Sequence, residues 1–217
     1  MIKGVIFDND GVILDSMGIW AKVSENLIRF FGLEPDAGLI KVLASKSIEE
    51  ATELMKEKTQ INKSNEEIIR LIKEELDKMY FSAEKKPGIE NALSFLKSKN
   101  IPMVIASSGM RYHIEKSLSN HGLLKYFDNI FTNTEIGSSK SSPEIFLSAC
   151  EFLNIKPENC LVVEDSLYAL RTAEKAGFIT MGVSDNYNKE NQQYLKAEAD
   201  FYIDNMSEFK SALFGIV

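Results

Sequence analysis

The chain begins with a short apolar strand and continues with a long stretch of helical periodicity. Val5, Ile6 and Phe7 form an apolar run whose length and β-forming side chains predict a strand. Asp15 and Ser16 then stand where a helix cap is expected, because the residues after them place apolar side chains on one helical face. That face contains Ile19, Trp20, Val23, Leu27, Phe30 and Phe31.

Two further helix starts are predicted by the spacing of capping boxes. Ser47 is followed three residues later by Glu50, and Ser64 by Glu67. In a capping box the serine accepts a hydrogen bond from the third helical N–H, and the glutamate returns one to the serine backbone. Residues 15–81 contain no convincing strand pattern, so we expect an all-helical insert there.

The rest of the chain alternates between strand and helix patterns. Strands are predicted over 103–106, 129–132, 161–163, 179–183 and 201–203, and the helices between them over 89–97, 111–120, 143–152 and 166–176. This alternation predicts an α/β fold with a Rossmann-like, doubly wound parallel sheet. We expect a core domain of residues 1–14 and 85–217 and an inserted helical cap domain of residues 15–84.

Composition limits the classes of partner. A chain of 217 residues can bury one good core and a small accessory domain. The net charge of −7 disfavours sequence-independent nucleic-acid binding, which needs a basic face. Anionic small substrates stay possible, because a bound cation inverts the local field.

Cysteine use and the N-terminus predict a cytoplasmic protein. Cys150 and Cys160 lie in apolar patterns and are expected to be packed thiols, as in a reducing cytosol. The first apolar segment, with Lys3, is too short for a signal sequence, and no apolar run reaches membrane-spanning length. We expect neither nucleic acid nor membrane as a partner.

Two carboxylates follow the first strand directly. Strand alternation aims Asp8 and Asp10 to the same side, and Gly11 lets the chain turn away. Such a pair can hold a hard divalent cation, and one member can act as nucleophile or acid/base. Taken alone, the motif is equally compatible with an aspartate-rich turn.

Three later loops carry further polar groups. Ser107 and Ser108 end a predicted strand and suit a phosphate oxygen, although a simple helix cap fits them as well. Lys140 precedes a helix, where its charge opposes the helix dipole unless it points at an anion. Glu164 and Asp165 end another strand, where they complete a cation site or cap the next helix.

These four loops all lie at predicted strand ends that a doubly wound sheet brings to one edge. Together they contain the groups that phosphoryl transfer requires. The four ordered motifs resemble the haloacid dehalogenase superfamily, in the branch with a helical cap, over essentially the whole chain. The resemblance implies that Asp8 is the nucleophile, which forms an aspartyl-phosphate, and that Asp10 is the acid/base.

The resemblance also implies the ligands. Mg²⁺ would be held by Asp8, the backbone carbonyl of Asp10 and Asp165, with Glu164 nearby. Ser107, Ser108 and Lys140 would bind the phosphate. The chain departs from the family pattern at Ser141, where proline is common, and at Ala169, where glycine is usual. The presence of both Asp10 and Asp165 argues against a true dehalogenase, which works without metal.

The choice within this family depends on the cap. β-Phosphoglucomutases resemble the chain closely, but they carry histidine at the position of Trp20. Their cap also has an arginine-containing segment, whereas the comparable residues 41–46 of this chain include two lysines and no arginine. Sugar-phosphate phosphatases of this branch often have tryptophan at the position of Trp20. Ser16, Trp20 and Arg111 are therefore candidate substrate contacts, although Trp20 fits a core position and Arg111 a solvated helix face.

We therefore expect a monomeric Mg²⁺-dependent phosphatase acting on a small phosphorylated metabolite such as a sugar phosphate. One alternative is a β-phosphoglucomutase-like mutase, in which a substrate hydroxyl accepts the phosphoryl group. The other is a catalytically idle family member that only binds.

Overall fold

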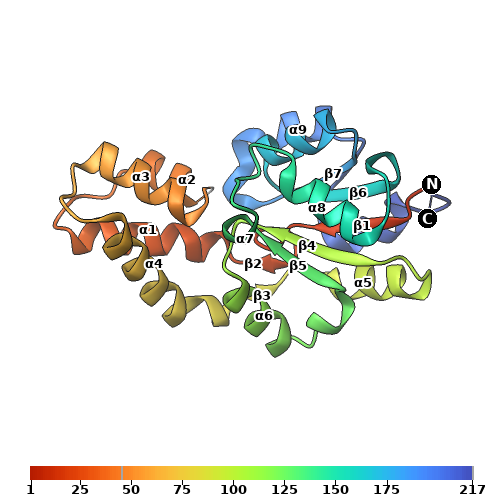
Figure 1. Ribbon diagram of the computed structural model, residues 1–217, viewed down its shortest axis with the longest axis horizontal. Helices are drawn as coiled ribbons and strands as arrows, with labels where there is room; N and C mark the ends of the chain where they lie inside the picture. The colour runs from red at the N-terminus through yellow and green to blue at the C-terminus, as the bar shows by residue number, and fades with distance from the viewer. Residues whose placement is uncertain (45, 217) are drawn as a thin grey trace. The chain divides into compact units, whose positions relative to one another are not determined.

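The computed structural model describes residues 1–44 and 46–216, which form two compact units (Figure 1). One unit contains Met1–Asp15 and the residues from Glu84 onward, and the other contains Ser16–Ala83. Ser45, in the cap stretch compared above with mutases, lies outside the described residues, as does Val217.

The first unit is built on a six-stranded parallel sheet, which confirms the predicted fold class. Its strand order is β5-β4-β1-β6-β7-β8. The strands are β1 Gly4–Phe7, β4 Met103–Ser107, β5 Asn129–Thr132, β6 Cys160–Glu164, β7 Ile179–Val183 and β8 Phe201–Ile203.

The direction of winding reverses beside β1. The chain passes from β1 outward to β4 and β5, and then returns to β6 on the other side of β1. Right-handed crossovers therefore put α5 (Ile89–Ser98) and α6 (Arg111–Asn120) on one face, and α8 (Glu144–Leu153) and α9 (Leu167–Lys175) on the other (Figure 1). Open α/β sheets bind ligands beyond the strand ends at this reversal.

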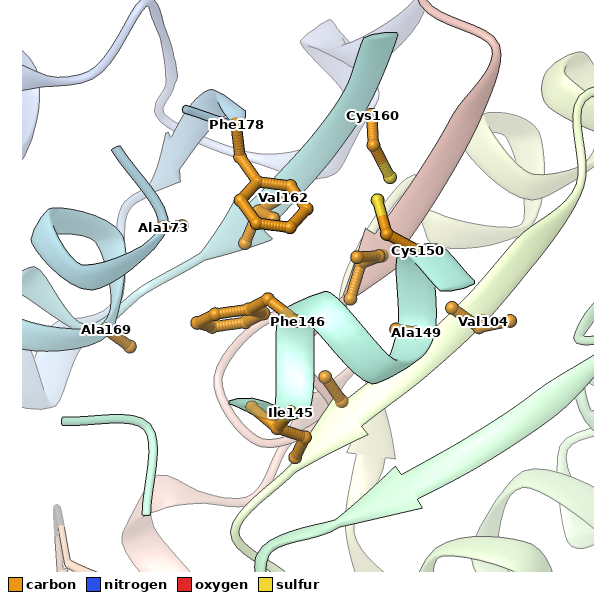
Figure 2. Close-up of a cluster of buried hydrophobic side chains, with 12 residues drawn as sticks. Val104, Ile145, Phe146, Ala149, Cys150, Cys160, Val162, Ala169, Ala173 and Phe178 are labelled. Carbon is orange, nitrogen blue, oxygen red and sulfur yellow. The ribbon is translucent and has the colours of Figure 1, made fainter. Parts of the chain in front are cut away.

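A buried apolar cluster joins α8 and α9 to the sheet (Figure 2). The rings of Phe146 and Phe178 meet at a centroid distance of 6.0 Å. Burying each such ring stabilises the fold by about 1.5–3 kcal/mol. The sulfur atoms of Cys150 and Cys160 face one another in this cluster as free, buried thiols, so the expectation of packed thiols is confirmed.

The second unit is helical, with α1 Met17–Phe30, α2 Ala37–Ala44, α3 Ile48–Thr59 and α4 Asn65–Met79. Both predicted capping boxes are confirmed, at Ser47 with Glu50 and at Ser64 with Glu67. Ser16 occupies the N-cap position of α1, but its side chain makes no capping bond. The sequence reading missed α2, although Asp36 accepts a hydrogen bond from the Leu39 N–H at its start.

Two very short strands mark the passage between the units. β2 (Leu14–Asp15) pairs antiparallel with β3 (Glu84–Lys85). Asp15 and Glu84, which we expected in the helical insert, thus belong to the sheet-containing unit. Strands of two residues show no alternation that a sequence pattern can reveal.

The remaining α-helices of the described residues are short: α7 Asn133–Ile136, α10 Gln192–Glu198 and α11 Phe209–Ala212. None of the helices among the described residues combines the length and apolar character that a membrane crossing requires.

Candidate active site

The residues predicted to carry the chemistry come from segments that meet at the carboxyl ends of β1 and β6. Asp8 follows β1, and its N–H donates to the carbonyl of Val163 in β6 at 2.9 Å. Glu164 ends β6 and Asp165 follows it. Oxygens of Asp8, Glu164 and Asp165 lie within 4.8 Å of one another, and all three side chains are buried. The parallel pairing of β1 with β6 creates this cluster directly.

Lys140 enters the cluster from the loop that precedes α8. Its Nζ lies 2.7 Å from Oδ1 of Asp8 and 2.6 Å from Oε1 of Glu164, and only 2% of the side chain is exposed. The expectation that this lysine points at an anion agrees with these contacts. A buried ammonium needs such partners, because an unpaired charge in a low-dielectric site is very costly.

Burial dominates the electrostatics of this cluster. It raises the pKa of Asp8 to about 8, against the opposing charge of Lys140. Burial also raises the pKa of Asp165, and the charges of Asp8 and Glu164 add to the effect. For Lys140 burial acts in the opposite sense, but the Asp8 and Glu164 carboxylates outweigh it and raise its pKa above the ordinary value. The single lysine therefore does not neutralise three crowded carboxylates.

The donor set fits a divalent cation such as Mg²⁺, which prefers oxygen ligands and takes few of them from protein. Oε2 of Glu164 is buried and has no hydrogen-bond partner among the described residues. The Asp165 carboxylate lies against the backbone of Gly11, where a β-carbon would stand 2.4 Å from Oδ2. Gly11 also has a φ of +83°, so both the turn and this close approach require glycine.

Asp10, in the turn after β1, lies close to the serine loop that follows β4. A β-carbon on Gly109 would be 3.3 Å from both Oδ2 of Asp10 and Oγ of Ser107. Ser107 is fully buried and accepts a hydrogen bond from the Gly109 N–H at 3.0 Å. The structure thus brings Asp10 beside the predicted phosphate loop, as a general acid would require.

The sequence reading missed two residues that contact Ser108. The amide of Asn133, at the start of α7, donates to Oγ of Ser108 at 2.9 Å. Tyr168, at the start of α9, also hydrogen-bonds Ser108, and burial raises its pKa to about 12. A polar residue directly after β5 was the only sequence indication for Asn133, and Tyr168 had none.

Each of the three candidate substrate contacts has its own contacts within its unit. Trp20 packs edge-on against the buried ring of Tyr80 at 6.2 Å within the helical unit, where Ser16 is also buried. Arg111 binds Glu135 through Nε at 2.5 Å and Nη2 at 2.9 Å, and Glu115 through Nη1 at 3.2 Å. The Glu135 pair joins α6 to α7, the Glu115 pair lies within α6, and a substrate contact of Arg111 stays a prediction.

The chain matches the family model described as haloacid dehalogenase-like hydrolase over residues 2–177. It is 29% identical over 177 residues to a phosphorylated carbohydrates phosphatase of Thermotoga maritima, covering 81% of this chain and 82% of that protein. It is 26% identical to 6-phosphogluconate phosphatase of Escherichia coli, with 87% and 86% covered. Among solved structures, β-phosphoglucomutase of Clostridium difficile superposes with a TM-score of 0.77 at 26% identity, over 97% of this chain and 94% of that one.

Proposed function

Because the chain belongs to the haloacid dehalogenase-like hydrolases, we propose that it is a phosphatase that hydrolyses a small phosphorylated metabolite with the help of Mg²⁺. The observation that carries the proposal is the buried contact of Lys140 with Asp8, beside two further carboxylates at the reversal point of the sheet. A cation-assisted nucleophilic carboxylate is what phosphoryl transfer needs at that place.

The reaction divides between the two aspartates. Asp8 attacks phosphorus, forms an aspartyl-phosphate and displaces the leaving alcohol, to which Asp10 donates a proton. Asp10 then takes a proton from the water that attacks the intermediate, releasing inorganic phosphate and restoring Asp8. Lys140 balances the negative charge that accumulates on the phosphoryl oxygens.

The remaining polar groups of the site bind the phosphate group of the substrate and hold its ligands in position. Ser107 and Ser108 contribute hydroxyls and backbone N–H groups to the phosphate, and Asn133 and Tyr168 hold the Ser108 hydroxyl in place. Mg²⁺, when bound by Asp8, Asp165 and the Asp10 carbonyl, would supply positive charge to the transferring phosphoryl group. Glu164 holds Lys140 through its Oε1 atom, and its Oε2 atom, which has no hydrogen-bond partner among the described residues, would be available to the cation.

The substrate class we propose is a sugar phosphate. The two curated relatives described above are named for phosphorylated carbohydrates and for 6-phosphogluconate. An acidic protein can bind such an anion because the cation and Lys140 would together offset the charge of the three carboxylates.

A mutase is the second candidate, favoured by the likeness to a β-phosphoglucomutase structure. A mutase must hold a second phosphate in its cap, a task suited to the bidentate fork of arginine. This chain has no arginine between Phe31 and Ile69, and Lys41 and Lys46 offer only point charges. It also has Trp20 where those mutases carry histidine. We therefore rank phosphatase above mutase, and an idle binding protein below both, since Asp8, Asp10, Lys140 and Asp165 are all present.

The test is a panel of phosphorylated metabolites assayed for phosphate release with Mg²⁺. A second assay offers β-glucose 1-phosphate with a catalytic amount of glucose 1,6-bisphosphate and follows glucose 6-phosphate. We expect phosphate release from sugar phosphates of hexose size or smaller, and no isomerisation. Isomerisation faster than phosphate release would favour the mutase, and absence of turnover on every ester would favour a binding protein.

A further inference from the structure

A residue outside the four motifs holds the Asp165 carboxylate. The side-chain amide of Asn188 donates to Oδ2 of Asp165 at 2.6 Å and to the Asp165 carbonyl oxygen at 3.3 Å. Asn188 is buried, with 8% of its surface exposed. An amide N–H₂ group in this position restricts the orientation of the carboxylate, because it donates to one of its two oxygens.

Asn188 is presented by a turn that Asp185 organises. The turn is the 3-10 segment Asn186–Asn191, which begins directly after Asp185. Oδ1 of Asp185 accepts from the Tyr187 N–H at 2.8 Å, and its carbonyl accepts from the Asn188 N–H at 3.1 Å. The same carbonyl accepts from Nε2 of Gln192 at 2.9 Å. The backbone at Asn188 therefore has little freedom as long as Asp185 keeps its place.

Asp185 is in turn held by a lysine from the passage between the two units. Nζ of Lys86 lies 2.5 Å from Oδ2 of Asp185, whose side chain is 1% exposed. Lys86 follows β3 directly, and its N–H donates to the carbonyl of Ile13 at 2.8 Å. The same ammonium lies 3.6 Å from Oδ1 of Asp15 on β2. Asp185 is buried and Lys86 is half-buried, so removing the lysine would leave an uncompensated charge on the buried carboxylate.

We propose that Asn188 is a positioning residue for the cation site, and that the Lys86–Asp185 pair sets the position of its turn. Partners that orient a metal ligand typically change metal affinity or activity by about 10- to 100-fold when removed. The inference rests on the proposed function only in taking Mg²⁺ as the cation. It also means that the two strands joining the units, β2 and β3, are connected by hydrogen bonds and ion pairs to the loop that carries a cation ligand.

The test measures Mg²⁺ binding to the purified protein by isothermal titration calorimetry. In Asn188→Ala we expect the Mg²⁺ dissociation constant to rise by about 10- to 100-fold. Asn188→Asp keeps the shape but replaces the donor by a fourth carboxylate, so it should bind Mg²⁺ no better than Asn188→Ala. Asn186→Ala is the matched control, because Asn186 is exposed in the same turn, and its affinity should equal that of the wild type.

The Lys86 arm is tested with a double variant. Lys86→Met alone leaves the buried Asp185 carboxylate without its counter-charge and can destabilise the fold. The double variant Lys86→Met/Asp185→Asn, which removes both charges, is therefore measured beside it. Both should weaken Mg²⁺ binding in the same direction as Asn188→Ala. In turnover assays, Asn188→Ala should raise the Mg²⁺ concentration needed for half activity while kcat at saturating Mg²⁺ stays within a few-fold of wild type.

The outcomes separate this inference from the proposed function. An unchanged Mg²⁺ dissociation constant in Asn188→Ala, with only a lower melting temperature, would overturn the positioning role and leave the phosphatase intact. Weaker Mg²⁺ binding in Asn188→Ala, in a protein that hydrolyses no phosphate ester, would support the positioning role and overturn the phosphatase. A wild type that binds no Mg²⁺ would overturn both.

Discussion

Nζ of Lys140 lies 2.7 Å from Oδ1 of Asp8, and both side chains are buried. The lysine thus contacts the proposed nucleophile itself, and Glu164 holds it there from the other side at 2.6 Å. This arrangement gives Lys140 two functions that can be measured separately. It offsets the charge of the buried carboxylates, and in the proposed reaction it would also face the negative charge of the phosphoryl group transferred to Asp8.

Replacing Lys140 should therefore damage both activity and stability. In Lys140→Met we expect kcat to fall by about 10²- to 10³-fold, the usual cost of losing one group that stabilises transition-state charge. The free energy of unfolding should fall by up to about 3–5 kcal/mol, because two buried carboxylates lose their counter-charge. Denaturant unfolding and steady-state kinetics measure the two effects. The exposed Lys156→Met is the control and should change neither; equal behaviour of the two variants would contradict both roles.

Asp8→Asn should abolish turnover and leave the fold intact. The amide is nearly isosteric with the carboxylate but cannot form the acyl-phosphate, so a loss of several orders of magnitude in kcat is expected. The measurement is phosphate release at saturating Mg²⁺, with circular dichroism to verify folding. Asp77→Asn, an exposed carboxylate of α4, should retain full activity. More than a small residual turnover in Asp8→Asn would show that the nucleophile is another group.

The contact between Gly11 and Asp165 gives a prediction with a close control. Ala at position 11 would place its β-carbon 2.4 Å from Oδ2 of Asp165, at a φ of +83°. Gly177 has a φ of +85°, but nothing lies within 4 Å of the corresponding β-carbon. Both substitutions should cost about 1–2 kcal/mol of stability from the left-handed backbone. Only Gly11→Ala should also weaken Mg²⁺ binding, because only this substitution forces the Asp165 carboxylate to move. Calorimetric Mg²⁺ titrations of the two variants measure the difference.

Removing Mg²⁺ with a chelator should abolish phosphatase activity reversibly. EDTA is expected to remove activity and added Mg²⁺ to restore it, because the oxygen donors of Asp8 and Asp165 suit this ion. Ca²⁺ should be a poor substitute, since it takes more ligands in a looser geometry. Phosphate release is measured before chelation, after it and after each ion is added back. Full activity in the presence of chelator would exclude a role for the cation.

The pH dependence of stability should change when Mg²⁺ binds. In the metal-free protein, burial raises the pKa of Asp8 to about 8, whereas an unfolded aspartate titrates near about 4. The contribution of protonated Asp8 to the free energy of unfolding is therefore fully present below about pH 4 and is lost as pH rises through 8. Mg²⁺ replaces the proton and should raise the melting temperature more at pH 8 than at pH 6.

Differential scanning fluorimetry with and without Mg²⁺ measures this effect. Asp8→Asn removes the titrating group, so its metal-free melting temperature should depend less on pH between 6 and 8 than that of the wild type. Identical pH profiles for the two proteins would mean that Asp8 is already ionised throughout this range.

The sequence by itself determined the sheet, most helices and the composition of the site. Hydrophobic periodicity located the strands of the parallel sheet within one or two residues, and serine–glutamate spacing located the starts of α3 and α4. Parallel strands that alternate with helices bring their carboxyl ends together, so Asp8 and Asp165, which directly follow strands, were expected to meet. Lys140 reaches them through the longer segment between β5 and α8.

Only the tertiary structure decided which polar groups hold the site residues and the turns around them in position. Asn188 on Asp165, Lys86 on Asp185 and Tyr168 on Ser108 join segments that lie far apart in sequence or on different loops. Local patterns encode periodicity and caps, because those depend on neighbours three or four residues away. Contacts between loops depend on the path of each loop in space. The pairing of β2 with β3 was missed because strands of two residues show no alternation.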